Sequence, residues 1–176
     1  MLVVEDSPTQ AELARALLHR LGHQVRVVAA AGPALEVARA WRPDAILLDV
    51  ELPDYDGFAL MRQFVATGVD AAVIVITANA SINTAVEAMR GGAVDFIVKP
   101  YAGARLSVTL ANALEKRALV AQLRQVRAQL ERDRFHGFIG ASATMQAAYR
   151  TIESVAASRA SVFITGESGT GKELAA

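Results

Sequence analysis

The chain has 176 residues, with 18 basic side chains, 18 acidic side chains and no cysteine. A formal net charge of zero gives no electrostatic reason to expect binding to nucleic acid or to a membrane surface. The absence of cysteine excludes a disulfide framework and thiol chemistry. No apolar run approaches the ~20 residues of a membrane span and no leader-like segment opens the sequence, so we expect a cytoplasmic protein without membrane contact.

The first part of the chain alternates short apolar runs with helical patterns. Residues 2–4 predict a strand. Residues 8–21 predict a helix with Pro at its start and an apolar stripe made of Leu13, Leu17, Leu18 and Leu21. Residues 25–28 then predict a second strand, and residues 32–41 predict a second helix.

The same alternation continues three more times. Residues 45–48 are an unbroken apolar run, typical of a strand that is buried on both faces of a parallel sheet, and residues 58–65 carry a helical apolar pattern. Residues 72–77 are a continuous β-branched run, followed by a helix at 81–90 that Ser can cap. Residues 96–98 predict the fifth strand.

Five alternations of strand and helix predict a single α/β domain over residues 1–115. Strands that alternate with helices favour a parallel sheet with right-handed crossovers. The expected fold is therefore a flavodoxin-like (βα)5, doubly wound parallel sheet.

Residues 116–137 are expected to form a linker. No Gly or Pro interrupts the chain between Gly103 and Gly137, so the fifth helix should continue past the first domain. An apolar seam with spacings of four, three and four then consists of Leu119, Leu123, Val126 and Leu130. Two interpretations stay open, a short coiled coil or an amphipathic helix that lies on its own domain. Residues 131–136 are expected to be a solvated hinge.

A second unit is expected over residues 138–176. Ser142 can cap a helix, and residues 162–165 predict a strand. The pattern G-x-x-x-x-G-K follows this strand, as in a phosphate-binding loop whose amides cradle phosphates while Lys172 reaches the β and γ groups. The candidate ATP-binding residues are Gly166, Glu167, Ser168, Gly169, Thr170, Gly171, Lys172 and Glu173. The last of these stands where Ser or Thr usually contacts Mg²⁺.

Polar residues follow the ends of four predicted strands of the first domain. Because the carboxyl ends of parallel strands meet at one edge, where such sheets bind ligands, we expect these groups to lie close together. They are Glu5, Asp6, Asp49, Thr77 and Lys99. Three carboxylates in one place repel one another unless a cation lies among them, and oxygen ligands of this kind suit Mg²⁺.

This combination of groups suits phosphoryl transfer. Asp49, placed between Mg²⁺ and Lys99, can act as the nucleophile toward a phosphoryl group. Mg²⁺, Lys99 and the hydroxyl of Thr77 can then hold the oxygens of the transferred group, which is catalysis by position and charge.

The same residues, in this order and spacing, resemble the receiver domain of bacterial two-component response regulators. The resemblance covers about residues 1–115 and implies that Asp49 accepts phosphate from a histidine kinase or a histidine-phosphotransfer protein. It implies a Mg²⁺ site made of Glu5, Asp6, Asp49 and the main-chain carbonyl of Glu51. It also implies a cis peptide between Lys99 and Pro100.

The resemblance further assigns Thr77 and Phe96 to a conformational switch. Phe96 is expected to turn inward as Thr77 moves onto the phosphate. Plain core packing of Phe96 stays the alternative.

The phosphate loop resembles that of the AAA+ ATPases that activate sigma-54 RNA polymerase, so that the whole sequence resembles the NtrC family. Residues 81–90 and 160–172 are similar to quorum-sensing members of that family. The resemblance implies phosphorylation-dependent control of the ATPase and of transcription, and a homodimer formed through the receiver or the linker helix. No Walker B residue, sigma-54 contact loop, arginine finger or helix-turn-helix occurs in these residues. ATP hydrolysis, polymerase contact and DNA reading are therefore expected only from a longer chain, and the present residues are expected only to gain and lose phosphate at Asp49.

Two other classes remain as alternatives. An aspartyl nucleophile with Mg²⁺ and Lys is also phosphatase chemistry, and Glu51 occupies the position of a general acid two residues after the nucleophile. A nucleotide- or flavin-binding protein could share the topology, but clustered acids disfavour a flavin phosphate and no phosphate-binding loop follows the first strand.

Overall fold

The structure is a computed structural model that describes residues 1–132, 134–135, 138–156, 161–165, 167 and 172. The chain divides into two compact units, Met1–Leu119 and Val120–Ala176. The domain boundaries expected at residues 115 and 137 stay predictions.

The first unit is built on a five-stranded parallel sheet in the order β2-β1-β3-β4-β5. The strands are β1 (Leu2–Val4), β2 (Arg26–Val28), β3 (Ala45–Asp49), β4 (Ala72–Thr77) and β5 (Asp95–Val98). Val4 pairs with Leu48, Asp49 pairs with Ile76, and Thr77 pairs with Val98. This register brings the carboxyl ends of the four strands β1, β3, β4 and β5 to one edge, as the sequence predicted.

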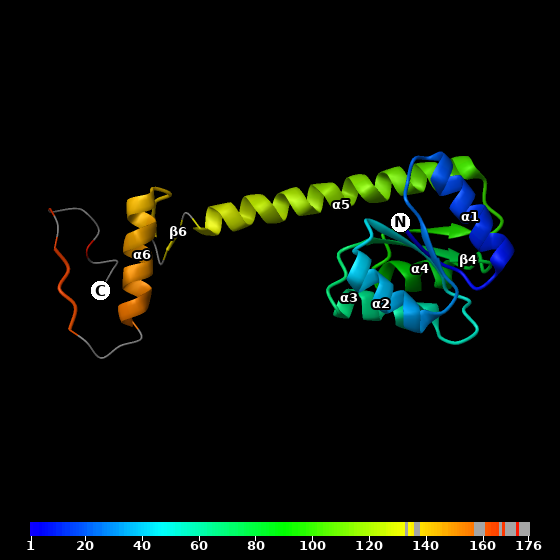
Figure 1. Cartoon of the computed structure of the whole chain (residues 1–176), viewed down its shortest axis with the longest axis horizontal. Coiled ribbons are helices and arrows are strands. Elements are labelled where there is room, and N and C mark those ends of the chain that lie inside the picture. The colour runs from blue at the N-terminus through cyan, green and yellow to red at the C-terminus, as the bar shows by residue number, and fades with distance from the viewer. Residues whose placement is uncertain (133, 136–137, 157–160, 166, 168–171, 173–176) are drawn as a thin grey trace. The chain divides into compact units, whose positions relative to one another are not determined.

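Helices cover both faces of this sheet (Figure 1). Those of the first unit are α1 (Pro8–Arg20), α2 (Ala31–Trp41), α3 (Gly57–Ala66), α4 (Ile82–Arg90) and the first part of α5 (Gly103–Arg132). One apolar core gathers buried residues of α1 and α5, and the other gathers those of α2, α3 and α4. Every residue of β3 and β4 is buried, which confirms the doubly wound fold class expected from their unbroken apolar runs.

The apolar stripe predicted for the first helix is partly wrong. Leu18 is fully buried, but Leu13 is 53% exposed and Leu21 is 41% exposed. Leu17 is partly buried and packs against the same core. The small residues Ala11 and Ala14 are buried as well. Because Ala counts little in an apolar pattern, the leucine stripe predicted the buried face of α1 only in part.

Helix α5 continues without a break from Gly103 to Arg132, which confirms that the fifth helix extends beyond residue 115. Leu119, Leu123 and Val126 are 54%, 63% and 57% exposed. These side chains are exposed, and the choice between a short coiled coil and an amphipathic helix stays a prediction.

The second unit begins within α5 and contains a short hairpin and a helix. Strand β6 (Arg134–Phe135) pairs antiparallel with β7 (Phe138–Ile139), where the sequence had predicted a solvated hinge. That prediction treated a charged run as loop, although strand pairing with a downstream segment decided its structure. Helix α6 (Ala143–Ala156) follows, and Ser142 caps it by accepting a hydrogen bond from the Met145 amide, as predicted.

The strand predicted at residues 162–165 does not form. These residues have no regular secondary structure, because a strand needs a partner strand and none of the described strands pairs with them. No helix within the described ranges is both long and apolar enough to cross a membrane.

Candidate functional site

Asp49 is the last residue of β3 and lies buried at the carboxyl edge of the sheet, with 3% of its surface exposed. Lys99, which follows β5, donates hydrogen bonds to Asp49 Oδ2 at 2.5 Å and to Glu5 Oε2 at 2.7 Å. These bonds supply the positive charge that buried carboxylates require. Lys99 thus contacts two side chains that are distant in sequence, Glu5 at 94 residues and Asp49 at 50 residues.

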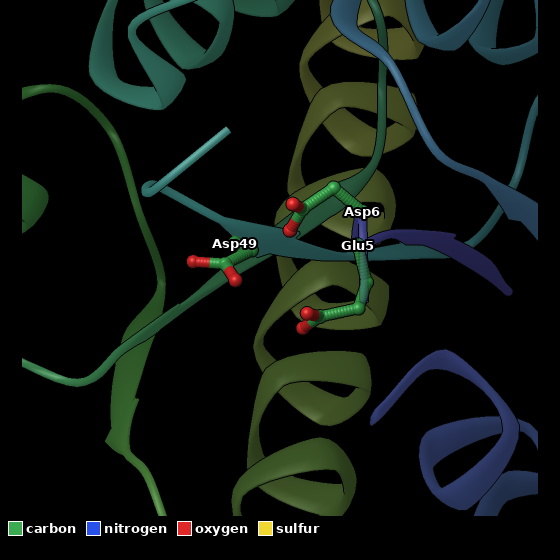
Figure 2. Close-up of side chains that lie close together, drawn as sticks. All are labelled: Glu5, Asp6 and Asp49. Atoms are coloured by element: carbon green, nitrogen blue, oxygen red, sulfur yellow. The ribbon is translucent and has the colours of Figure 1, made fainter. Parts of the chain in front are cut away.

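Three carboxylates gather at this edge, from Glu5, Asp6 and Asp49 (Figure 2). One oxygen of each lies within 4.8 Å of the others. Asp6 is exposed whereas Glu5 is buried, and within the described residues Glu5 Oε1 has no hydrogen-bond partner. A buried oxygen without a partner, beside an exposed carboxylate, fits a divalent cation that approaches from the solvent side.

Burial and the hydrogen bonds within the site shift the pKa values of Glu5 and Lys99 in opposite directions. Burial raises the pKa of Glu5, and the nearby charge of Asp49 raises it further, although the Lys99 hydrogen bond acts in the other direction. Burial alone would lower the pKa of Lys99, but hydrogen bonds to Asp49 and Glu5 outweigh it and leave that pKa raised. Lys99 is therefore charged at neutral pH and compensates carboxylates that crowd one another.

The loop between Asp49 and α3 is held by hydrogen bonds at both ends. The Glu51 amide donates to Asp49 Oδ1 at 2.9 Å, and Glu51 forms an isolated antiparallel bridge with Asp56. Asp56 caps α3, since its carboxylate accepts from the amides of Phe58 and Ala59. The Glu51 amide hydrogen bond therefore fixes the orientation of the Asp49 carboxylate, whereas the Glu51 side chain is exposed.

Gly57 packs against this loop more closely than a side chain would permit. A Cβ at this position would lie 2.7 Å from the Asp49 carbonyl oxygen and in still closer contact with Val50 Cα. Both are backbone atoms that cannot move aside easily. The absence of a side chain at Gly57 therefore allows the close approach of this backbone to Asp49.

Asp54 has a partner that sequence reasoning missed. Its Oδ2 accepts a 3.0 Å hydrogen bond from the amide of Ala31, the first residue of α2, 23 positions earlier. The available signal was Ala30, which holds the N-cap position of α2 but has no polar side chain with which to cap it.

The two predicted switch residues occupy neighbouring strands. The Thr77 hydroxyl is buried at the end of β4 and accepts a 3.0 Å hydrogen bond from the Asn79 amide. Phe96 pairs with Val75 in the sheet, is half-buried, and lines an apolar groove beside α4. The Lys99–Pro100 peptide is cis, as the resemblance implied.

Most of the predicted ATP-binding residues lie outside the described residues, namely Gly166, Ser168, Gly169, Thr170, Gly171 and Glu173. Among those described, Lys172 donates a hydrogen bond to the Glu167 carbonyl oxygen.

Comparison with protein families gives two matches. Residues 1–111 match the response regulator receiver domain, and residues 138–176 match the sigma-54 interaction domain. Both matches fall where the sequence patterns had placed a receiver and the start of an AAA+ unit.

Known proteins agree with these matches. The luminescence regulatory protein LuxO of Vibrio campbellii is 44% identical over 174 residues, which cover 99% of this chain and 38% of LuxO. The chain therefore spans well under half the length of this curated relative.

Solved structures agree as well. The receiver domain of a putative LuxO repressor protein from Vibrio parahaemolyticus superposes with a TM-score of 0.66 at 29% identity, covering 69% of this chain and 94% of that one. NtrX from Brucella abortus gives 0.68 at 34% identity, covering 99% of this chain and 38% of that one.

Both family matches agree with the site, in which Lys99 contacts Glu5 and Asp49 of the carboxylate cluster. The chain belongs to the response regulators with a receiver domain, and it continues into the start of a sigma-54 interaction domain, the arrangement of the NtrC family, with LuxO as a relative.

Proposed function

We propose that the chain is the receiver part of a two-component response regulator and that Asp49 accepts a phosphoryl group from a phosphohistidine on a histidine kinase or a phosphotransfer protein. The observation that carries this proposal is the pair of hydrogen bonds from Lys99 to Asp49 and Glu5. They hold the Asp49 carboxylate at the carboxyl edge of the sheet, next to the positive charge of Lys99.

The proposed step is a single displacement at phosphorus. A carboxylate oxygen of Asp49 attacks, its new bond to phosphorus forms, and the bond between phosphorus and the imidazole nitrogen breaks as the imidazole leaves. Lys99 is placed to stabilise negative charge on the phosphoryl oxygens. The Thr77 hydroxyl, which already accepts from Asn79, keeps its own proton to donate to one of those oxygens.

Mg²⁺ would be held by carboxylate oxygens of Glu5, Asp6 and Asp49. The main-chain carbonyl of Glu51 would be a further ligand. Their fit rests on the 4.8 Å cluster and on the unpartnered buried Glu5 Oε1. When bound, Mg²⁺ neutralises charge on the phosphoryl oxygens. The Glu51 amide orients the Asp49 carboxylate by its hydrogen bond to Oδ1.

The proposed output follows from the second unit. In a longer chain, residues 166–173 would cradle the phosphates of ATP in an AAA+ domain that activates sigma-54 RNA polymerase, and DNA would be contacted elsewhere. The LuxO relatives support a role in quorum sensing. Phosphate on Asp49 would shift the equilibrium between two receiver conformations, which would differ in the positions of Thr77 and Phe96.

We also propose that the protein forms a homodimer through the exposed seam of α5. Leu119, Leu123 and Val126 follow coiled-coil spacing, and more than half of each side chain is exposed. A second copy of the same helix would cover these side chains.

The test is the intact mass of the protein after incubation with acetyl phosphate and Mg²⁺. A gain of one phosphoryl group that is absent in Asp49→Asn supports the proposal. No gain from acetyl phosphate or from a phosphohistidine protein, in a chain shown to be folded, would exclude the proposed function.

The phosphatase alternative receives no support from the position of Glu51, whose side chain is exposed while its amide binds Asp49.

A further inference from the structure

Helix α2 begins without a capping side chain of its own. Its N-cap residue is Ala30, and its third position is Pro33, which has no amide hydrogen. The carboxylate of Asp54 supplies the missing acceptor for the Ala31 amide at 3.0 Å. A negative charge also suits the positive end of a helix. The cap of α2 therefore belongs to the loop that follows Asp49.

That loop also carries Glu51, and it is attached to the domain at successive points. The Glu51 amide binds Asp49, Leu52 is only 8% exposed and packs in the core that α2 shares, and Asp56 caps α3. Between Leu52 and Asp56, the hydrogen bond from Ala31 to Asp54 joins the exposed part of the loop to α2.

We propose that Asp54 is a positioning residue for the phosphorylation site, an inference that rests on the function proposed above. Mg²⁺ requires near-ideal octahedral geometry, and a main-chain carbonyl can be aimed only by fixing the backbone around it. The carboxylates gathered at the site are those of Glu5, Asp6 and Asp49, whereas Asp54 binds Ala31. Asp54 acts through the loop that bears Glu51 and does not itself contact the metal or the phosphoryl group.

Two simpler roles make different predictions and can be separated by substitution. If Asp54 only stabilised α2, a new cap on that helix would replace it. Ala30→Ser provides one, since its hydroxyl can accept from the Gly32 amide without touching the loop. If Asp54 acted only by its charge, Asp54→Asn would be as damaging as Asp54→Ala, although Asn keeps an oxygen that can accept the same hydrogen bond.

The experiment compares wild type, D54A, D54N and the double variant D54A/A30S by three measurements. The measurements are the thermal midpoint, amide hydrogen exchange at Glu51 without metal, and Mg²⁺ affinity from an NMR titration of backbone amides. We expect D54A to exchange faster at Glu51 and to bind Mg²⁺ about fivefold more weakly, the size expected from loss of one cap interaction. D54N should stay close to wild type. D54A/A30S should recover its midpoint while exchange at Glu51 and Mg²⁺ binding stay impaired.

Three results would overturn the inference. They are unchanged Mg²⁺ binding in D54A, equal loss in D54N and D54A, or recovery of Mg²⁺ binding together with the midpoint in the double variant. Glu36→Ala removes an exposed carboxylate from α2 and should match wild type in all three measurements. Failure of the wild type itself to bind Mg²⁺ and to accept phosphate would instead overturn the proposed function, and this inference with it.

Discussion

Arg117 of α5 donates a 2.8 Å hydrogen bond from Nη1 to Asp44 Oδ1, directly before the first residue of β3. Its Nε also donates to the carbonyl oxygen of Asp70 at 3.0 Å, two residues before β4 begins. The two strands whose beginnings it joins are those that end in Asp49 and Thr77. The last part of α5 within the first unit is thus attached to the strands that carry the candidate site.

Arg117→Met should lower the free energy of unfolding by about 1 kcal/mol, because both acidic partners are largely exposed and such ion pairs are weak. Hydrogen exchange of the amides at residues 113–119 should accelerate, since the helix loses its attachment there. Urea unfolding and exchange measured by mass spectrometry check both effects. Lys116→Met removes a neighbouring exposed charge and should change neither; equal effects in the two variants would argue against the attachment.

Lys99→Met should lower the free energy of unfolding without Mg²⁺ by about 3 kcal/mol, because Glu5 and Asp49 would remain buried without a cation. Mg²⁺ should then raise the thermal midpoint more in the variant than in wild type. Uptake of phosphate should fall about 100-fold through loss of a charge at the transition state. Thermal unfolding with and without Mg²⁺, followed by intact mass over time, measures all three. A variant that melts like wild type in metal-free buffer would contradict the neutralising role of Lys99.

Gly57→Ala should destabilise the protein by about 3 kcal/mol, because the new methyl group meets backbone atoms of Asp49 and Val50. Phosphate uptake should fall as well, since the loop beside the nucleophile must shift. Gly32→Ala is the matched control, because a Cβ there meets nothing within 4 Å. It should be neutral or slightly stabilising. Urea unfolding of both variants gives the comparison, and similar losses in the two would rule out the close contact as the cause.

Leu123→Glu should weaken self-association about tenfold or more, because the charge would have to be buried in the seam or leave the helices apart. Sedimentation velocity over a range of protein concentrations measures the effect. Gln125→Glu adds the same charge on the same helix outside the seam and should leave association unchanged. Undiminished association of the Leu123 variant would place the dimer interface elsewhere.

The parts of the fold that could be predicted from sequence are those fixed by local pattern. The sheet was predicted by the unbroken apolar runs of β3 and β4. The polar residues that follow these runs predicted the edge at which the candidate site lies. The strand Arg134–Phe135 could not be predicted, because its structure depends on pairing with Phe138–Ile139. Residues 162–165 carry a strand pattern, but pattern alone does not provide the partner strand.

The candidate site shows the same division. Lys99 and the acids follow predicted strands, so their meeting could be inferred from topology. The contacts of Asp54 with Ala31 and of Arg117 with Asp44 join segments 23 and 73 residues apart. No periodicity marks such contacts, because each depends on how segments distant in sequence come together.

The unbroken course of α5 has a geometric consequence. Each residue of an α-helix turns the chain by about 100°, because one turn contains about 3.6 residues. The apolar seam begins at Leu119, two residues after Arg117, so its angular position is set by a count of residues from that side chain. Removing one residue between them would rotate the seam by about 100° around the helix axis, whereas inserting four would restore its phase to within about 40°.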